Sequence, residues 1–135
     1  ELRTPTVESG AGRGSARLFG DYVRAEDGAG EPLPQVPPLR LGAALGLERG
    51  RLQLGVEALW HDAQDRLAVN ELPTDGFTLL SADLAYRLPA WGRGMLWFVR
   101  GSNLLDEDAR RHVSPLKDRA PLAGRSVSAG VRLEF

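Results

Sequence analysis

The sequence predicts an all-β fold, an antiparallel up-and-down meander of about six strands. Three observations predict it. Apolar residues alternate with polar or small ones over runs of about 9–11 residues, glycine (16) and proline (9) cluster between these runs, and the connections alternate between long and short. With 42% apolar and 26% charged residues, the composition excludes a disordered tail.

The clearest element is a hairpin in the first half of the chain. One run puts five apolar residues on a single face: Leu39, Leu41, Ala43, Leu45 and Leu47. After a predicted Arg49-Gly50 turn, a second run does the same with Leu52, Leu54, Val56, Ala58 and Trp60. Two period-2 runs around a two-residue glycine turn predict a β-hairpin.

Three later runs show the same alternation. They span Phe77 to Arg87, Met95 to Ser102, and the end of the chain from Ser126 to Phe135. An earlier strand is expected near Ala16 to Ala25, but its two faces are mixed and the pattern does not orient it. Residues 1–14 are expected to be a leading segment or turn.

The connections indicate where such a sheet would reside. Long loops are expected near 26–38, 62–76 and 103–124, and short ones at 49–50 and 88–94, so the long loops collect at one rim. This asymmetry is typical of bacterial outer-membrane barrels, and about 9–11 residues are what a tilted strand needs to cross the hydrocarbon layer. No apolar run approaches the ~18 residues of a membrane-spanning helix.

The predicted location is therefore the outer membrane of a Gram-negative bacterium, with lipid as a partner. Trp60, at the long-loop end, and Tyr86 and Trp97 are the expected membrane-interface aromatics. Six strands cannot close a barrel, since the smallest have about eight. The chain is thus expected to be the terminal part of a larger barrel, or to assemble with further copies.

From Phe98 onward the sequence carries a series of motifs. An aromatic-rich strand leads into Asn103-Leu104-Leu105-Asp106, a long loop follows with Ala123-Gly124-Arg125, and the last strand ends in Phe135. This series resembles the C-terminus of TonB-dependent outer-membrane receptors, whose usual P-G-R element reads Ala-Gly-Arg here. The resemblance covers nearly the whole chain after Ser15.

The resemblance implies a barrel of about 22 strands around an N-terminal plug. It also implies energy supplied through TonB and import of a scarce nutrient such as a metal ion or a metal chelate. The plug and the remaining strands would be partners absent from this chain. Phe135 is the residue that the resemblance assigns to the barrel-assembly machinery.

Two loops carry candidate metal ligands. Carboxylates and a neutral imidazole can bind zinc, and His112 lies in the last long loop with three acidic residues. The candidate ligands are Asp106, Glu107, Asp108, His112 and the rim residue His61. The resemblance extends to zinc- and iron-chelate-uptake receptors. The alternative is a solvated acidic loop whose charge is balanced by Arg110 and Arg111.

The composition argues against several other functions. A net charge of −1 gives no basis for binding nucleic acid, and without cysteine there is no thiolate site. Ser114, His112 and Asp118 are not positioned by any pattern as a catalytic triad, so neither an enzyme nor an intrinsic cofactor is expected.

Three alternatives remain open at this stage. They are a porin-like barrel, a soluble β-sandwich acting as an interaction module, and a refolded oligomer pairing its open edges. A sandwich would bury the faces of 39–47 and 127–135 against each other, whereas a barrel would turn both toward lipid.

Overall fold

The computed structural model describes residues 2–3, 7–9, 12–90 and 93–134. Eight strands and no helix are found among them, so none of these residues lies in a helix able to span a membrane. The strands are β1 (Leu2–Arg3), β2 (Val7–Ser9), β3 (Gly12–Asp21), β4 (Arg40–Arg49), β5 (Leu52–His61), β6 (Phe77–Ala90), β7 (Arg93–Ser102) and β8 (Ser126–Glu134).

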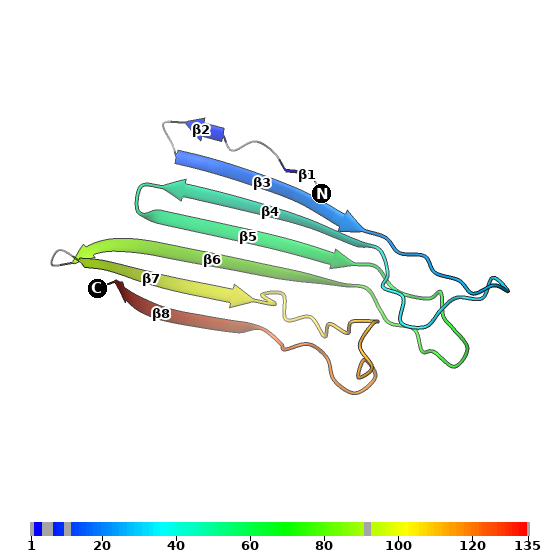
Figure 1. Cartoon of the computed structure of the whole chain (residues 1–135). Coiled ribbons are helices and arrows are strands. Elements are labelled where there is room, and N and C mark those ends of the chain that lie inside the picture. Colours follow the sequence, from blue (N-terminus) through cyan, green and yellow to red (C-terminus); the bar gives the residue numbers. More distant parts are fainter. Residues whose placement is uncertain (1, 4–6, 10–11, 91–92, 135) are drawn as a thin grey trace.

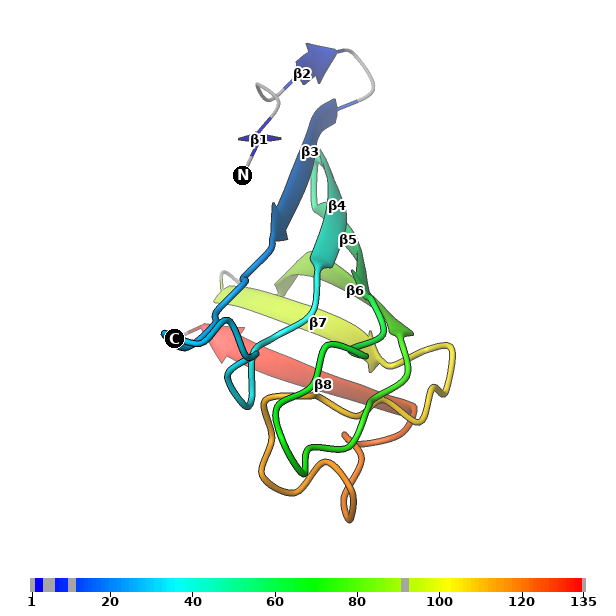
Figure 2. The same cartoon turned by 90° about the vertical axis from the view of Figure 1, so that its right-hand side faces the viewer.

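The strands form one antiparallel sheet in the order β1-β3-β4-β5-β6-β7-β8, with β2 also paired to β3. From β3 to β8 each strand pairs with its neighbour in sequence, which confirms the predicted up-and-down meander (Figure 1). Figure 2 shows the strand direction turning progressively from β3 to β8. The described strands therefore form one curved layer, and no second layer of described residues packs on the sheet.

Some boundaries differ from those expected. The first long strand runs from Gly12 to Asp21 rather than near Ala16 to Ala25, and β1, β2 and the start of β3 occupy much of the expected leading segment. The hairpin turn is one residue later than predicted, because Arg49 and Leu52 are paired and Gly50 adopts a φ of 58°. The expected 88–94 connection shortens to residues 91–92, which lie outside the described residues.

The sheet has one continuous apolar face. The pairing aligns Leu45 with Val56, and further along Tyr86 with Trp97 and then Trp97 with Val131. Leu45 is 64% exposed and Val127 67%, so none of the described residues covers this face, and the sandwich alternative does not hold. Among the described residues the buried hydrophobic side chains are only Phe77 and Ala109.

The opposite face is polar, with aromatic rings set over glycines. A Cβ on Gly130 would come within 2.5 Å of the Phe98 ring, and one on Gly42 would collide with the ring of Phe19. The guanidinium of Arg17 lies 4.9 Å from the centre of the Phe19 ring and 2.9 Å from Glu57. Thus β3 is oriented with Arg17 and Phe19 on the polar face, which the sequence pattern left undecided.

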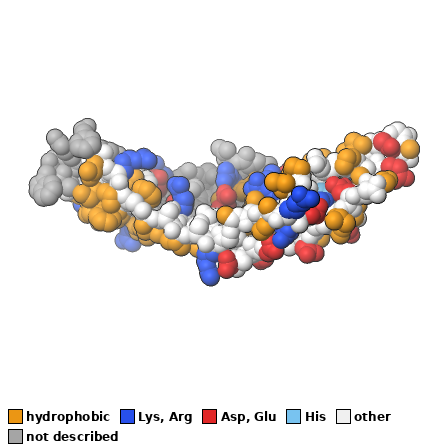
Figure 3. Space-filling model, turned by 90° about the horizontal axis from the view of Figure 1, so that it is seen from below, with side chains coloured by type: hydrophobic (Ala, Val, Ile, Leu, Met, Phe, Trp, Pro, Cys, Tyr) orange, Lys and Arg blue, Asp and Glu red, His pale blue; other side chains and the backbone are white. Residues whose placement is uncertain are grey.

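The two ends of the sheet carry connections of different length. Loops 22–39, 62–76 and 103–125 gather at one end, and the short turns lie at the other (Figure 1). Figure 3 shows a curved shell with acidic side chains mainly over the long-loop half, while hydrophobic side chains lie over both halves. The three long loops and many of the acidic side chains thus lie toward the same end of the sheet.

Candidate functional site

The three long loops pack on one another through polar side chains. The described polar residues that are buried as whole residues all lie in these loops or at the strand end beside them: His61, Gln64, Thr74, Asn103, His112 and Lys117. Buried polar groups require hydrogen-bond partners, and Gln64, Thr74, Asn103, His112 and Lys117 find theirs in the loops. The three loops consequently hold one another in place through these contacts.

A charged cluster of Glu71, His112 and Lys117 lies at the centre of this packing. Their side chains are only 8%, 1% and 8% exposed. His112 Nε2 lies 3.0 Å and Lys117 Nζ 3.7 Å from Glu71 Oε1, and Lys117 also donates to the carbonyl of Leu72 at 2.5 Å. The last loop is thereby fastened to loop 62–76.

The third loop joins the same cluster through backbone amides. The amide of Gln35 donates to Glu71 Oε1 at 2.9 Å, and that of Ala68 donates to Glu71 Oε2 at 3.1 Å. One carboxylate therefore connects loops 22–39, 62–76 and 103–125.

The protonation of the cluster follows from its contacts. His112 Nδ1 lies 3.2 Å from the ammonium of Lys117. An ammonium group can only donate hydrogen bonds, so Nδ1 accepts, and the ring proton is on Nε2, which faces Glu71. Burial, and then the charge of Lys117, lower the pKa of His112 from 6.5, and Glu71 only partly offsets this.

Glu71 is held in its ionised form. Burial alone would raise its pKa, but the amide hydrogen bonds from Gln35 and Ala68 and the nearby His112 and Lys117 outweigh burial, and the net pKa lies below 4.5. The cluster at neutral pH is therefore a carboxylate with one ammonium and a neutral imidazole.

The Asn103-Leu104-Leu105-Asp106 motif shapes the start of the last loop. Asn103, at a φ of 48°, donates through Nδ2 to the carbonyls of Glu107 and Ala123 and accepts from the Glu107 amide. Asp106 accepts from the amide of Arg125 at 2.9 Å. The motif thus ties the beginning of the loop to its end, and the Ala123 position contributes only its carbonyl to the bond with Asn103.

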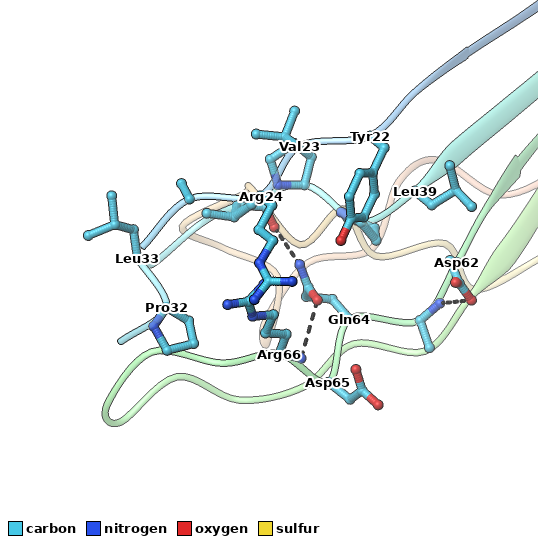
Figure 4. Close-up of a pocket in the computed structure, with 15 residues that line it drawn as sticks. Tyr22, Val23, Arg24, Pro32, Leu33, Leu39, Asp62, Gln64, Asp65 and Arg66 are labelled. Carbon is cyan, nitrogen blue, oxygen red and sulfur yellow. Dashed lines mark hydrogen bonds between the residues drawn. The ribbon is translucent and has the colours of Figure 1, made fainter. Parts of the chain in front are cut away.

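A pocket of about 200 Å³ opens between loops 22–39 and 62–76. Figure 4 shows Tyr22 and Arg24 on one side and Gln64 and Arg66 on the other. Gln64 donates to the carbonyl of Val36 at 2.8 Å. Arg24 and Arg66 both pair with the carboxylate of Glu26. The two loops that line the pocket are thus joined by a hydrogen bond from Gln64 and an ion pair of Arg66.

A second cavity, of about 260 Å³, lies where the polar face of the sheet meets the loops. It is lined by Asp21, Pro37, Pro38, Arg40, His61, Arg111 and Val113. Asp21, Arg40, His61 and Phe77 form one row across the strands. Arg40 binds Asp21 at 2.6 Å, and the ring of His61 stacks on Phe77 at 4.3 Å.

The predicted metal ligands are dispersed. Asp106 binds Arg125, Asp108 binds Arg110, and Glu107 uses its backbone in the Asn103 turn. His112 is in the charged cluster and His61 in the row on the polar face. Within the described part of the chain, no three His, Cys, Asp or Glu residues converge as metal ligands. Metal binding by this set stays a prediction.

The structure also places the remaining predicted residues. Trp60 is beside Leu41 near the long loops, and Tyr86 and Trp97 are paired near the short turns, all on the apolar face. Phe135 lies outside the described residues. Sequence reasoning missed Glu71 and Lys117. Lys117 had one signal, since it is the only lysine in the sequence, and Glu71 had none.

One solved structure supports the fold independently. The chain is similar to the copper transporter OprC over 96% of its own length, with 24% sequence identity and a TM-score of 0.75. It spans about a fifth (21%) of that protein. No family model matches the chain. At this identity the likeness shows the fold alone: the meander of this chain is folded like the part of OprC that it matches.

Proposed function

We propose that this chain is the C-terminal barrel segment of an outer-membrane receptor that imports a scarce nutrient, a metal ion or a metal chelate. The whole receptor would comprise an N-terminal plug and further strands, and would be energised through TonB. In this proposal the chain itself carries out no catalysis and holds no resident cofactor.

The single observation that carries the proposal is the uncovered apolar face. Six consecutive strands, β3 to β8, present it without a second layer among the described residues, and each of the six is 9, 10 or 14 residues long. A tilted strand needs about 9–11 residues to cross the hydrocarbon layer, and the apolar band would face lipid. The likeness to a copper transporter supports the nutrient class.

Surface labelling tests the proposed topology. This chain has no cysteine, so single cysteines can be introduced into it once any cysteine elsewhere in the complete receptor has been replaced by serine. In intact cells that express the complete receptor, Val69→Cys, 82% exposed in loop 62–76, should react with an impermeant maleimide. Arg51→Cys, in the turn between β4 and β5, should react only after the outer membrane is opened. Labelling of Arg51→Cys in intact cells would contradict this orientation.

Uptake tests the transport role. A strain lacking the receptor should accumulate less copper or iron from dilute medium, and the receptor gene should restore uptake. The restored uptake should stop when the proton gradient is dissipated, since TonB draws its energy from the inner membrane. Uptake that persists without the gradient would point to a porin-like channel instead.

A further inference from the structure

The cavity at the loop end of the polar face combines excess positive charge with an unsatisfied buried group. His61 is 8% exposed, and its Nε2 atom is buried with no hydrogen-bond partner among the described residues. Buried polar atoms in folded proteins are nearly always satisfied by protein, water or a ligand. The missing partner of His61 is therefore a second observation that points to an occupant.

The charges around the cavity favour an anion. Two arginines, Arg40 and Arg111, line it against a single aspartate, Asp21. Arg40 is already bound to Asp21 through Nε and Nη2, whereas Arg111 is exposed and has no ion-pair partner among the described residues. A free metal ion would meet two guanidinium groups and only one carboxylate that is already engaged, which is an unfavourable environment for a cation.

The position of the cavity suits an incoming ligand. Arg40 and His61 are paired residues at the loop ends of β4 and β5, on the face that points away from the apolar band. Pro37 and Pro38 come from loop 22–39, and Arg111 and Val113 from loop 103–125. Residues at the ends of strands thus line one side of the cavity, and residues of two loops line the others. A volume of about 260 Å³ is just below the range of about 300–1,000 Å³ usual for ligand sites.

We propose that Arg40, His61 and Arg111 form a binding site for carboxylate- or phosphate-bearing anions at the outer mouth of the barrel wall. Arg111 offers a planar pair of donors suited to such oxyanions, and His61 Nε2 offers one further donor. The inference rests on the proposed uptake function and sharpens it. The metal would arrive as a negatively charged chelate, not as a free ion.

Histidine NMR provides a direct test, because the chain has only two histidines, His61 and His112. With the complete receptor in detergent and 15N-labelled histidine, citrate is titrated as the probe, and the variants His61→Gln and His112→Gln assign the two signals of this segment. Citrate should move the His61 signal saturably and leave that of His112 in place. No movement of His61 up to millimolar citrate would overturn the proposal.

Three variants separate a site from general attraction. Arg111→Gln should weaken citrate binding about tenfold or more, the usual effect of losing a charged hydrogen bond. Asp21→Asn should strengthen it, because Arg40 is released and a negative charge removed. Arg119→Gln, which removes the same charge from the same loop outside the cavity lining, should leave affinity unchanged. An equal loss in Arg119→Gln, or weaker binding in Asp21→Asn, would contradict the proposal.

A free cation is the competing occupant. Cu²⁺ is the probe for this alternative. If Cu²⁺ shifts the His61 signal at a lower concentration than citrate does, and Arg111→Gln lowers that concentration further, the site binds cations and the proposal is wrong. The outcome is separable from the proposed function. Gradient-dependent uptake with no citrate binding would contradict only the proposed anion site. Citrate binding without uptake would contradict only the proposed transport role.

Discussion

Asn103 is the residue with the most hydrogen bonds to lose at the start of the last loop. It is 5% exposed, and its side-chain amide makes three bonds to the backbone, one of them across 20 residues to Ala123. Its φ of 48° lies in the left-handed region, which asparagine tolerates better than most residues. Both properties explain why an asparagine stands at this position.

Replacing Asn103 by alanine should therefore destabilise the folded protein. Leaving buried backbone groups unsatisfied costs about 1–3 kcal/mol, in addition to the backbone strain. The measurement is the denaturation midpoint in detergent, followed by heat-modifiable electrophoretic mobility. Asn70→Ala is the matched control, because Asn70 is exposed and has a similar φ of 66°. Equal losses in the two variants would assign the effect to backbone strain alone.

Phe19 and Gly42 act as a pair that connects β3 to β4. They are directly paired in the register, and the ring lies over the space that a Cβ of residue 42 would occupy. Ala43, the next residue, points to the apolar face and pairs with Leu18. The two positions on one strand thus differ in the room they leave for a side chain.

Gly42→Val should consequently impair folding, because the side chain meets the Phe19 ring, and overpacking costs about 1–3 kcal/mol. The double variant Gly42→Val with Phe19→Ala should recover part of the loss. Ala43→Val should have little effect. The folded fraction in detergent reports all three. A Gly42→Val protein as stable as the Ala43→Val protein would show that the ring moves aside freely.

The three long loops have an acid-sensitive connection. The folded-state pKa of His112 lies below 6.5, so the unfolded chain takes up a proton first as pH falls. The His112 contribution to stability is full above about pH 6.5 and decreases below it. The folded-state pKa of Glu71 lies below 4.5, so its contribution is full above that value and is lost as pH falls further. Both groups therefore weaken the loop packing in acid.

Hydrogen exchange should detect this weakening. The amides of Gln35 and Ala68 donate to Glu71, so their protection, corrected for intrinsic exchange, should fall as the pH is lowered from about 6.5. The amides of Ala29 and Glu31, bound to Asp27 in the tip of loop 22–39, serve as the control. An NMR titration giving His112 a midpoint above 6.5 would show that the direction is wrong.

The strands show how much of the fold could be predicted from sequence. The alternation is clean in β4 and β8, where small or polar residues face inward, and nearly so in β5, where Leu59 is the exception; these strands were placed to within a residue or two. In β3 an inward Phe19 next to an outward Leu18 obscures the alternation. Its orientation depends on Gly42, a residue of the next strand.

The loop cluster could not be predicted in the same way. Lys117 reaches Leu72 across 45 residues, and His112 reaches Thr74 across 38. No local pattern links such positions, since they meet only after the meander has brought the three loops to one end. The sequence did indicate that His61 lies at the rim, but its neighbours Arg40 and Asp21 come together through strand register.

At the scale of the molecule, the apolar face distinguishes a membrane wall from a soluble sheet. Leu45 is near the middle of β4 and Leu41 near its long-loop end, and both point to the apolar face with 64% and 49% exposure. In water, an arginine at either exposed site would be almost neutral for stability. In a bilayer the cost depends on depth, at about 2–4 kcal/mol at the midplane and about 0–1 near the interface.

Leu45→Arg should therefore destabilise the complete receptor in phospholipid vesicles by about 2–4 kcal/mol, and Leu41→Arg by no more than about 1. Denaturant unfolding from vesicles measures both on the same strand, so differences in strand propensity cancel. The paired design also separates depth from local packing, because both leucines lie opposite apolar neighbours, Val56 and Trp60. Equal and small effects at the two sites would mean that the face meets water, and the receptor assignment would then fail with it.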